Sequence, residues 1–196
     1  MLLRKIEIKS TVKSHYNIWI AESYSCQNDI IQLLKNSNLS PYLTIFCSHS
    51  KQRPELKLLA DYFFQQPVIK DSPDWLLEQC KKHSIQLLFC GKHSQFIEQF
   101  REEFSRHDIQ LVTGARGISQ HKNVNNKFLF GQICEGLNLP SISAAKVAHV
   151  NELKQAIDEY QQRYSVICAK PVYGVYGAGF VQLSDDVSYF MKFQSN

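Results

Sequence analysis

The chain has 196 residues, of which 44% are hydrophobic and 20% are charged, and its formal net charge is +4. This composition is typical of a globular protein and excludes an intrinsically disordered chain. The basic residues are dispersed and form no dense block, so they give no indication of a nucleic-acid-binding arm. No apolar run approaches the ~20 residues that a membrane helix needs. We therefore expect a cytoplasmic protein with neither a nucleic-acid nor a membrane partner.

Apolar and amphipathic segments alternate through the first half of the chain. Strands are expected where β-branched and aromatic residues cluster, at residues 17–22, 42–47, 63–68, 85–90 and 109–112. Helices are expected where apolar residues recur at helical spacing, at residues 29–34, 54–62, 71–84 and 94–107. Pro67 makes the third strand an edge strand. Strand–helix alternation of this kind predicts the α/β fold class, with a parallel sheet covered on both faces and a Rossmann-like domain over residues 1–113.

The cysteine pattern argues against a metal site or a disulfide framework. None of the cysteines forms a C-x-x-C pair, and most of them lie in apolar runs. We expect free, buried thiols in a reducing compartment. The six residues are Cys26, Cys47, Cys80, Cys90, Cys134 and Cys168.

The texture of the sequence changes near Gly114, where a polar and turn-rich stretch marks the expected domain boundary. Beyond it we expect helices at residues 127–137 and 150–164. The stretch VICAKPVYGVYGAGFVQL at residues 166–183 then places two apolar runs on either side of three glycines. The second predicted domain covers residues 114–196.

Four explanations of the glycine cluster can be compared. A structural hairpin is the simplest, because glycine adopts positive φ without penalty. A P-loop is excluded because Lys170 precedes the glycines and no helix follows, and the spacing G-x-x-G-x-G differs from the dinucleotide fingerprint. A flexible loop over a nucleotide is the fourth explanation. Glycines let backbone N–H groups approach phosphate oxygens, and Lys170 would add a positive charge beside them.

The motif K-P-x-x-G-x-x-G-x-G-F after an apolar strand resembles the ATP-grasp superfamily, in its carbamoyl-phosphate-synthetase-like and biotin-carboxylase-like branch. The surrounding order is similar too, with Asn126-Lys127 opening a helix, EGLNLP at residues 135–140, and a second helix before the motif. The combination G-V-Y-G-A-G-F is similar to ATP-grasp proteins found alongside tellurite-resistance operons. The resemblance implies a Rossmann-like pre-ATP-grasp domain over residues 1–113. The first, incomplete part of an ATP-grasp domain would follow over residues 114–196.

The resemblance also implies residue roles. Lys170 matches the family lysine that contacts the α- and β-phosphates, and Lys127 matches an earlier nucleotide lysine. Two positions depart from the family pattern: Asn126 stands where Asp is usual, and Tyr176 stands where many members carry glycine. The implied ATP-binding set consists of Lys127, Lys170, Gly174, Tyr176, Gly177 and Gly179.

The implied cofactors are ATP and Mg²⁺, with the acidic Mg²⁺ ligands expected beyond this chain. The family reaction joins a carboxylate to an amine or similar nucleophile through an acylphosphate. We expect no catalytic residue in this chain and no ligase activity from it alone, and the two substrates cannot be read from the sequence. The sequence does not decide the oligomeric state, and a homo-oligomer is one of the partner arrangements considered. The alternative function is a non-enzymatic nucleotide-sensing or partner-binding α/β module.

Other polar residues give weaker signals. Arg116 follows the last strand of the first domain, where open α/β sheets bind ligands, so it is a candidate contact to substrate or phosphate. His121 is a candidate anion contact, but a solvated loop position is the simpler expectation. Asp185 and Asp186 are expected in a solvated turn rather than in a metal site.

Overall fold

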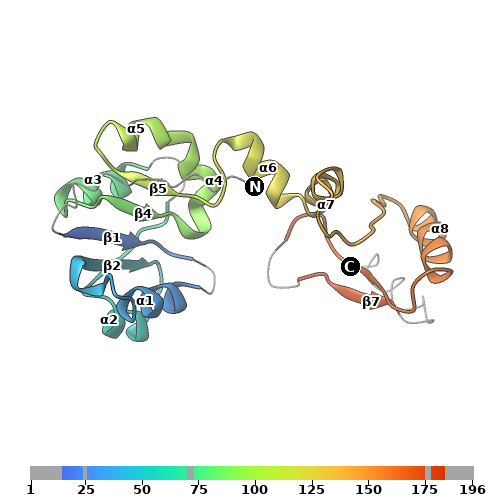
Figure 1. The fold of residues 1–196 in the computed structure, drawn as a ribbon, viewed down its shortest axis with the longest axis horizontal. Coiled ribbons are helices and arrows are strands. Elements are labelled where there is room, and N and C mark those ends of the chain that lie inside the picture. Colours follow the sequence, from blue (N-terminus) through green and yellow to red (C-terminus); the bar gives the residue numbers. More distant parts are fainter. Residues whose placement is uncertain (1–14, 24–25, 70–72, 175–177, 184–196) are drawn as a thin grey trace, which may run out of the picture. The chain divides into compact units, whose positions relative to one another are not determined.

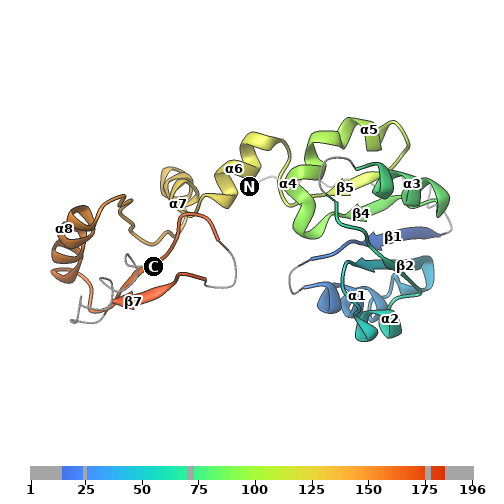
Figure 2. The ribbon, with the colours of Figure 1, turned by 180° about the vertical axis from the view of Figure 1, so that it is seen from behind.

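The computed structural model describes residues 15–23, 26–69, 73–174 and 178–183. The chain forms two compact units, of which unit 1 ends at His121 and unit 2 begins at Lys122. Figures 1 and 2 show the two units from opposite sides. The domain boundary that the sequence predicts, after residue 113, lies a few residues before this division.

Unit 1 contains a five-stranded parallel sheet in the order β3-β2-β1-β4-β5. The chain therefore winds from β1 toward one edge of the sheet and then from β4 toward the other, as in doubly wound α/β folds. The predicted α/β fold class is confirmed, and β3 is an edge strand as expected. The strands are β1 (Tyr16–Ile20), β2 (Leu43–His49), β3 (Tyr62–Gln65), β4 (Leu87–Phe89) and β5 (Gln110–Val112).

Helices cover both faces of this sheet. On one face, Ile31 of α1 (Gln27–Lys35) and Leu56 of α2 (Pro54–Leu59) pack in one core cluster with Ile18 and Ile20. On the other face, Trp19 packs in a second cluster with residues of α3 (Asp74–Lys82), α4 (Ser94–Ile97) and α5 (Arg101–Ser105). The alternation of Ile18, Trp19 and Ile20 between the two clusters explains why β1 reads as one continuous apolar run.

The single helix expected at residues 94–107 is divided in two. A 3₁₀ turn, Glu98–Phe100, separates α4 from α5. A 3₁₀ turn brings residues i and i+3 onto the same side, and here it places Glu98 beside Arg101, with Arg101 Nη2 2.7 Å from Glu98 Oε2. Apolar periodicity alone does not reveal such a break, because Phe96, Phe100 and Phe104 keep helical spacing across it.

Unit 2 contains α7 (Lys127–Gly136), α8 (Val150–Gln161) and an antiparallel hairpin of β6 (Ile167–Ala169) and β7 (Val181–Leu183). The two helices and the strand–glycine–strand unit expected from the sequence are confirmed. A further helix, α6 (Ile118–Asn125), crosses the division between the units. Its polar sequence was expected to be turn-rich, and this expectation is wrong. Ile118 and His121 lie three residues apart, and the helix buries His121.

The two units differ in how much apolar surface they bury. Among the described residues, every fully buried hydrophobic side chain lies in unit 1 except Ile157 of α8. Helix α7 buries none of its residues and exposes Leu129, Phe130 and Ile133 by 39–45% each. Within the described ranges, every helix is too short or too polar to span a bilayer.

All six cysteines are free thiols, as the sequence predicts. Cys47, Cys80 and Cys90 are buried in unit 1, whereas Cys26 and Cys168 are exposed, so burial holds for only part of the set. Burial raises the pKa of Cys47 and of Cys90 to about 12. The buried thiols are therefore protonated at neutral pH and chemically unreactive.

Candidate functional site

The β6–β7 hairpin has one covered face and one open face. Its pairing places Ala169 opposite Val181 and Cys168 opposite Gln182. Ala169 and Val181 are half-buried, whereas Cys168 and Gln182 are exposed, and α8 lies beside β6. Lys170 continues the exposed series at the end of β6, and its ammonium has no hydrogen bond or ion pair with any described residue. Among the described residues, the predicted phosphate lysine is thus exposed and unpaired.

Glycine is needed at both described ends of the loop between the strands. Gly179 has φ +73°, and a Cβ there would lie 2.6 Å from Pro171 Cγ, so the loop closes tightly on the proline ring. Gly174 has φ +145°, a conformation that other residues rarely adopt. Tyr176 and Gly177, the other two predicted loop contacts, lie outside the described residues.

The start of α7 is joined to the beginning of this loop. The Lys127 backbone N–H donates to the Val172 carbonyl at 3.0 Å. The Lys127 ammonium donates to the Gly174 carbonyl at 2.8 Å. Two predicted site residues that are 47 positions apart in sequence thus lie in direct contact. The sequence could suggest each of them separately, but not their contact.

Asn126 adds a second link between the same two segments. As the N-cap of α7, its Oδ1 accepts a hydrogen bond from the Leu129 N–H at 3.0 Å. Its Nδ2 donates to the Tyr173 hydroxyl oxygen at 3.1 Å. Sequence reasoning missed Tyr173, and only its place between Lys170 and the first loop glycine could have drawn attention to it.

The assembled groups are hydrogen-bond donors. Lys170 and Lys127 each carry an ammonium group, the Tyr173 hydroxyl carries a proton, and glycines allow backbone N–H groups to come close. Such a set suits the oxygens of a phosphate chain. A metal site is a different matter, because the described residues contain no group of three His, Cys, Asp or Glu side chains able to hold an ion. Asp185 and Asp186 lie outside the described residues.

The two other candidates, Arg116 and His121, belong to unit 1. Arg116 is exposed, and its guanidinium makes no hydrogen bond with a described residue. His121 is only 5% exposed and lies inside α6, so the expectation of a solvated loop is wrong. Its Nε2 is buried without a hydrogen-bond partner among the described residues.

A cluster of charged and polar groups occupies the carboxyl edge of the unit 1 sheet, where open α/β sheets bind ligands. Glu22 follows β1 and is 4% exposed. Its Oε1 lies 2.6 Å from Lys92 Nζ, which follows β4, and 3.7 Å from His49 Nε2 at the end of β2. Ser50 donates its hydroxyl to the same carboxylate at 2.9 Å. The charges of this cluster are paired with one another.

The pKa values of this cluster follow from its burial and pairing. Burial alone would raise the pKa of Glu22, but hydrogen bonds from Lys92 and Ser50 hold it below its ordinary value. Burial lowers the pKa of His49, against the opposing effect of Glu22. Sequence reasoning missed Glu22 and Lys92, because the sequence does not state which strands are neighbours.

A second buried carboxylate, Glu98, accepts hydrogen bonds from Arg101 and from residues that follow β5. Arg101 Nε and Nη2 donate to its two oxygens at 2.8 and 2.7 Å. The Thr113 hydroxyl donates to Oε2 at 2.6 Å, and the Gly117 N–H donates to Oε1 at 2.7 Å. Hydrogen bonds from Arg101 are the main cause that lowers the pKa of Glu98 to about 2. This carboxylate thereby fixes the segment between β5 and α6.

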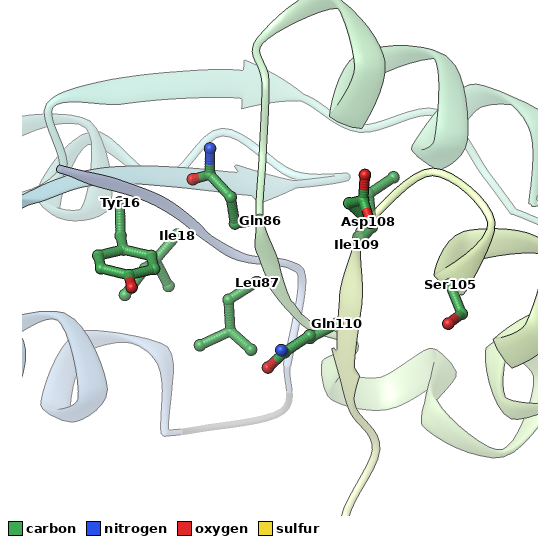
Figure 3. A pocket seen from close by; sticks show the side chains of 8 residues that line it. All are labelled: Tyr16, Ile18, Gln86, Leu87, Ser105, Asp108, Ile109 and Gln110. Carbon is green, nitrogen blue, oxygen red and sulfur yellow. The ribbon is translucent and has the colours of Figure 1, made fainter. Parts of the chain in front are cut away.

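A cavity of about 610 Å³ lies at the opposite, amino-terminal edge of the unit 1 sheet. In Figure 3, side chains from β1, β4 and β5 line it in succession. This edge is not where open α/β sheets bind ligands, and the residues that line the cavity all belong to unit 1. The lining residues are Tyr16, Ile18, Gln86, Leu87, Ser105, Asp108, Ile109 and Gln110.

Comparisons with known proteins show the fold. No protein-family model matches the sequence, and no curated protein matches it. Among solved structures, the biotin carboxylase domain of 2-oxoglutarate carboxylase from Hydrogenobacter thermophilus, crystallised with MgADP, ADP and bicarbonate, matches 93% of this chain at 13% identity, with a TM-score of 0.61. N5-carboxyaminoimidazole synthetase from Staphylococcus aureus, complexed with ADP, matches 91% at 12% identity and TM-score 0.62.

A third structure, N5-carboxyaminoimidazole ribonucleotide synthetase from Thermotoga maritima, matches 87% of this chain at 10% identity and TM-score 0.54. The chain spans only 40–44% of the length of these three proteins. All three are ATP-grasp structures. The chain therefore has the fold of the N-terminal part of ATP-grasp enzymes, and the resemblance read from the sequence is confirmed at the level of the fold.

Proposed function

We propose that the chain is the N-terminal part of an ATP-grasp ligase and that unit 2 binds the phosphates of ATP. The observation that carries the proposal is the contact between Lys127 and Gly174 at the base of the glycine loop, together with an exposed Lys170 that is unpaired among the described residues. Residues 1–113 would form the pre-ATP-grasp domain, and residues 114–196 the first part of the ATP-grasp domain. The ADP and MgADP bound in the matched structures support ATP as the nucleotide.

Each proposed contact has a physical role. Lys170, on the open face of the hairpin, would neutralise the α- and β-phosphates. Lys127 would exchange its bond to the Gly174 carbonyl for a phosphate oxygen, because a charged acceptor forms the stronger hydrogen bond. The remaining contacts would come from the loop, at Gly174, Tyr176, Gly177 and Gly179.

The ligation reaction needs more than this chain. In a complete enzyme of this kind, a carboxylate takes the γ-phosphate of ATP, and an amine or similar nucleophile then displaces phosphate from the acylphosphate. Among the described residues, no group of three His, Cys, Asp or Glu side chains could hold an ion, and the chain covers only 40–44% of the length of the matched enzymes. We therefore expect the chain alone, supplied with MgATP, a carboxylate and an amine, to release no ADP.

ATP binding by the isolated chain tests the proposal. The dissociation constant for MgATP is measured by NMR titration for the wild type, Lys170→Ala and Lys154→Ala. Lys154 is an exposed lysine of α8 and serves as the matched control. Loss of a charge-assisted phosphate contact should weaken binding by about tenfold or more in Lys170→Ala. Equal binding by the two variants, or no binding by the wild type, would contradict the proposal.

The exposed apolar side chains of α7 support a second candidate, a nucleotide-sensing or partner-binding α/β module without catalysis. Leu129, Phe130 and Ile133 would then contact a partner protein. The two candidates differ in the role of the loop. Replacing Gly177 and Gly179 with alanine should leave partner binding intact if that binding is the whole function, whereas it should abolish nucleotide binding in an enzyme.

A further inference from the structure

We infer that the Tyr173 hydroxyl is an additional hydrogen-bond donor to the phosphate chain, and that Asn126 is the residue that positions it. The inference rests on the proposed function, because it assigns two more residues to the same nucleotide site. Neither residue belongs to the set that the sequence resemblance implies.

The helix cap fixes the orientation of the Asn126 amide. A backbone N–H can only donate, so the Asn126 atom that faces the Leu129 N–H at 3.0 Å must be the oxygen. The amide nitrogen is then the atom 3.1 Å from the Tyr173 hydroxyl. Since the nitrogen carries only donors, the Tyr173 oxygen must accept. The Tyr173 proton is left free for another acceptor.

The surroundings of Tyr173 favour an anionic acceptor. The side chain is 60% exposed, so a ligand can reach it. The next residue, Gly174, has its carbonyl occupied by the Lys127 ammonium. The Tyr173 hydroxyl and the Lys127 ammonium are thus both held at the start of α7, through Asn126 and through the Gly174 carbonyl respectively. Phosphate oxygens would accept hydrogen bonds from both the Tyr173 hydroxyl and the Lys127 ammonium.

The identity of residue 126 decides whether the proton is free. An aspartate would cap α7 as well as asparagine does. Its second carboxylate oxygen, however, would accept the Tyr173 proton and would place a negative charge beside the phosphates. The asparagine at position 126 is thus the feature that leaves the Tyr173 proton available to a ligand.

The experiment measures the dissociation constant for MgATP in Tyr173→Phe, with Tyr164→Phe as the control. Tyr164 is also exposed, and its ring lies against Tyr160 of α8. We expect about tenfold weaker binding in Tyr173→Phe, the effect of one lost hydrogen bond to a charged group. The control should bind as the wild type does, and the melting temperature of both variants should stay unchanged.

A double-mutant cycle distinguishes the positioning of the Tyr173 hydroxyl by Asn126 from the structural role of Asn126 as a helix cap. Asn126→Asp should keep the melting temperature, because the cap is retained, and should weaken MgATP binding by about tenfold or more. Adding Tyr173→Phe to Asn126→Asp should cause no further loss, since the proton is already withdrawn. A full further loss in the double variant, or unchanged binding in Tyr173→Phe while Lys170→Ala is impaired, would overturn the inference alone. Wild-type chain that fails to bind MgATP would overturn the proposed function and the inference with it.

Discussion

Replacing Glu98 with glutamine removes the charge around which the chain beyond β5 is ordered. The glutamine oxygen can still accept from the Gly117 N–H, which donates to Oε1 of Glu98 at 2.7 Å. At the position of Oε2, however, an NH₂ group would face Arg101 Nη2 and the Thr113 hydroxyl, both of which donate to that oxygen. Glu98 is 6% exposed, so water cannot replace the lost acceptor.

The magnitude follows from the pKa of Glu98, which falls from 4.5 to about 2 on folding. A difference of this size corresponds to on the order of 3 kcal/mol of stability. Because the folded pKa is the lower one, this contribution is present above pH 4.5 and is lost as the pH falls toward 2. Glu98→Gln should therefore lower the unfolding free energy of unit 1 by on the order of 3 kcal/mol at pH 7. The deficit should shrink between pH 4.5 and pH 2.

Tryptophan fluorescence during urea unfolding measures this effect in unit 1 alone. The chain has two tryptophans, Trp19 and Trp75, and both lie in the unit 1 core. Glu102→Gln, on the exposed surface of α5, is the control and should shift stability by less than about 0.5 kcal/mol. Equal unfolding midpoints for Glu98→Gln and Glu102→Gln, or a deficit at pH 7 that persists undiminished at pH 2, would refute the reasoning.

Two further changes have expected outcomes. Lys92→Met leaves Glu22 buried without its ammonium partner, so the unfolding free energy of unit 1 at pH 7 should fall by about 2 kcal/mol in the same fluorescence assay. The loss should fade in acid as Glu22 becomes protonated, and a loss that is independent of pH would contradict the pairing. Gly179→Ala forces a Cβ to within 2.6 Å of Pro171 Cγ at φ +73°. The left-handed backbone alone should destabilise the hairpin by about 1–2 kcal/mol. Amide hydrogen exchange in β6 and β7 should therefore become faster. Unchanged exchange would show that the loop closes differently.

Much of the fold could be predicted from the sequence because its elements are strongly patterned. The apolar run at β1 and the strand–glycine–strand unit are local signals, and local signals suffice to place strands. The break at Glu98–Phe100 was not predictable, because it depends on a carboxylate that bonds to Thr113 and Gly117, which are distant along the chain. Helix α6 was not predicted for a related reason. Its sequence is mostly polar, so no apolar periodicity marks the face that buries His121.

Only those residues of the candidate site that belong to a sequence motif could be predicted. Lys170 and the loop glycines follow one another in sequence, so their spacing is itself a signal. The contact of Lys127 with Gly174 and that of Asn126 with Tyr173 join positions 47 residues apart, and no spacing rule gives them. The same holds for Glu22 and Lys92, which meet because β1 and β4 are neighbours in the sheet.

The uneven burial of the two units means that they draw on different sources of stability. Unit 1 encloses its own core, so its unfolding midpoint at a given pH should not depend on a ligand of unit 2. Unit 2 encloses little more than Ile157 among the described residues, so a bound molecule can contribute a large share of its folding free energy, in proportion to the logarithm of that molecule's concentration. If unit 2 binds a nucleotide as proposed, the nucleotide concentration would then influence how much of unit 2 is folded.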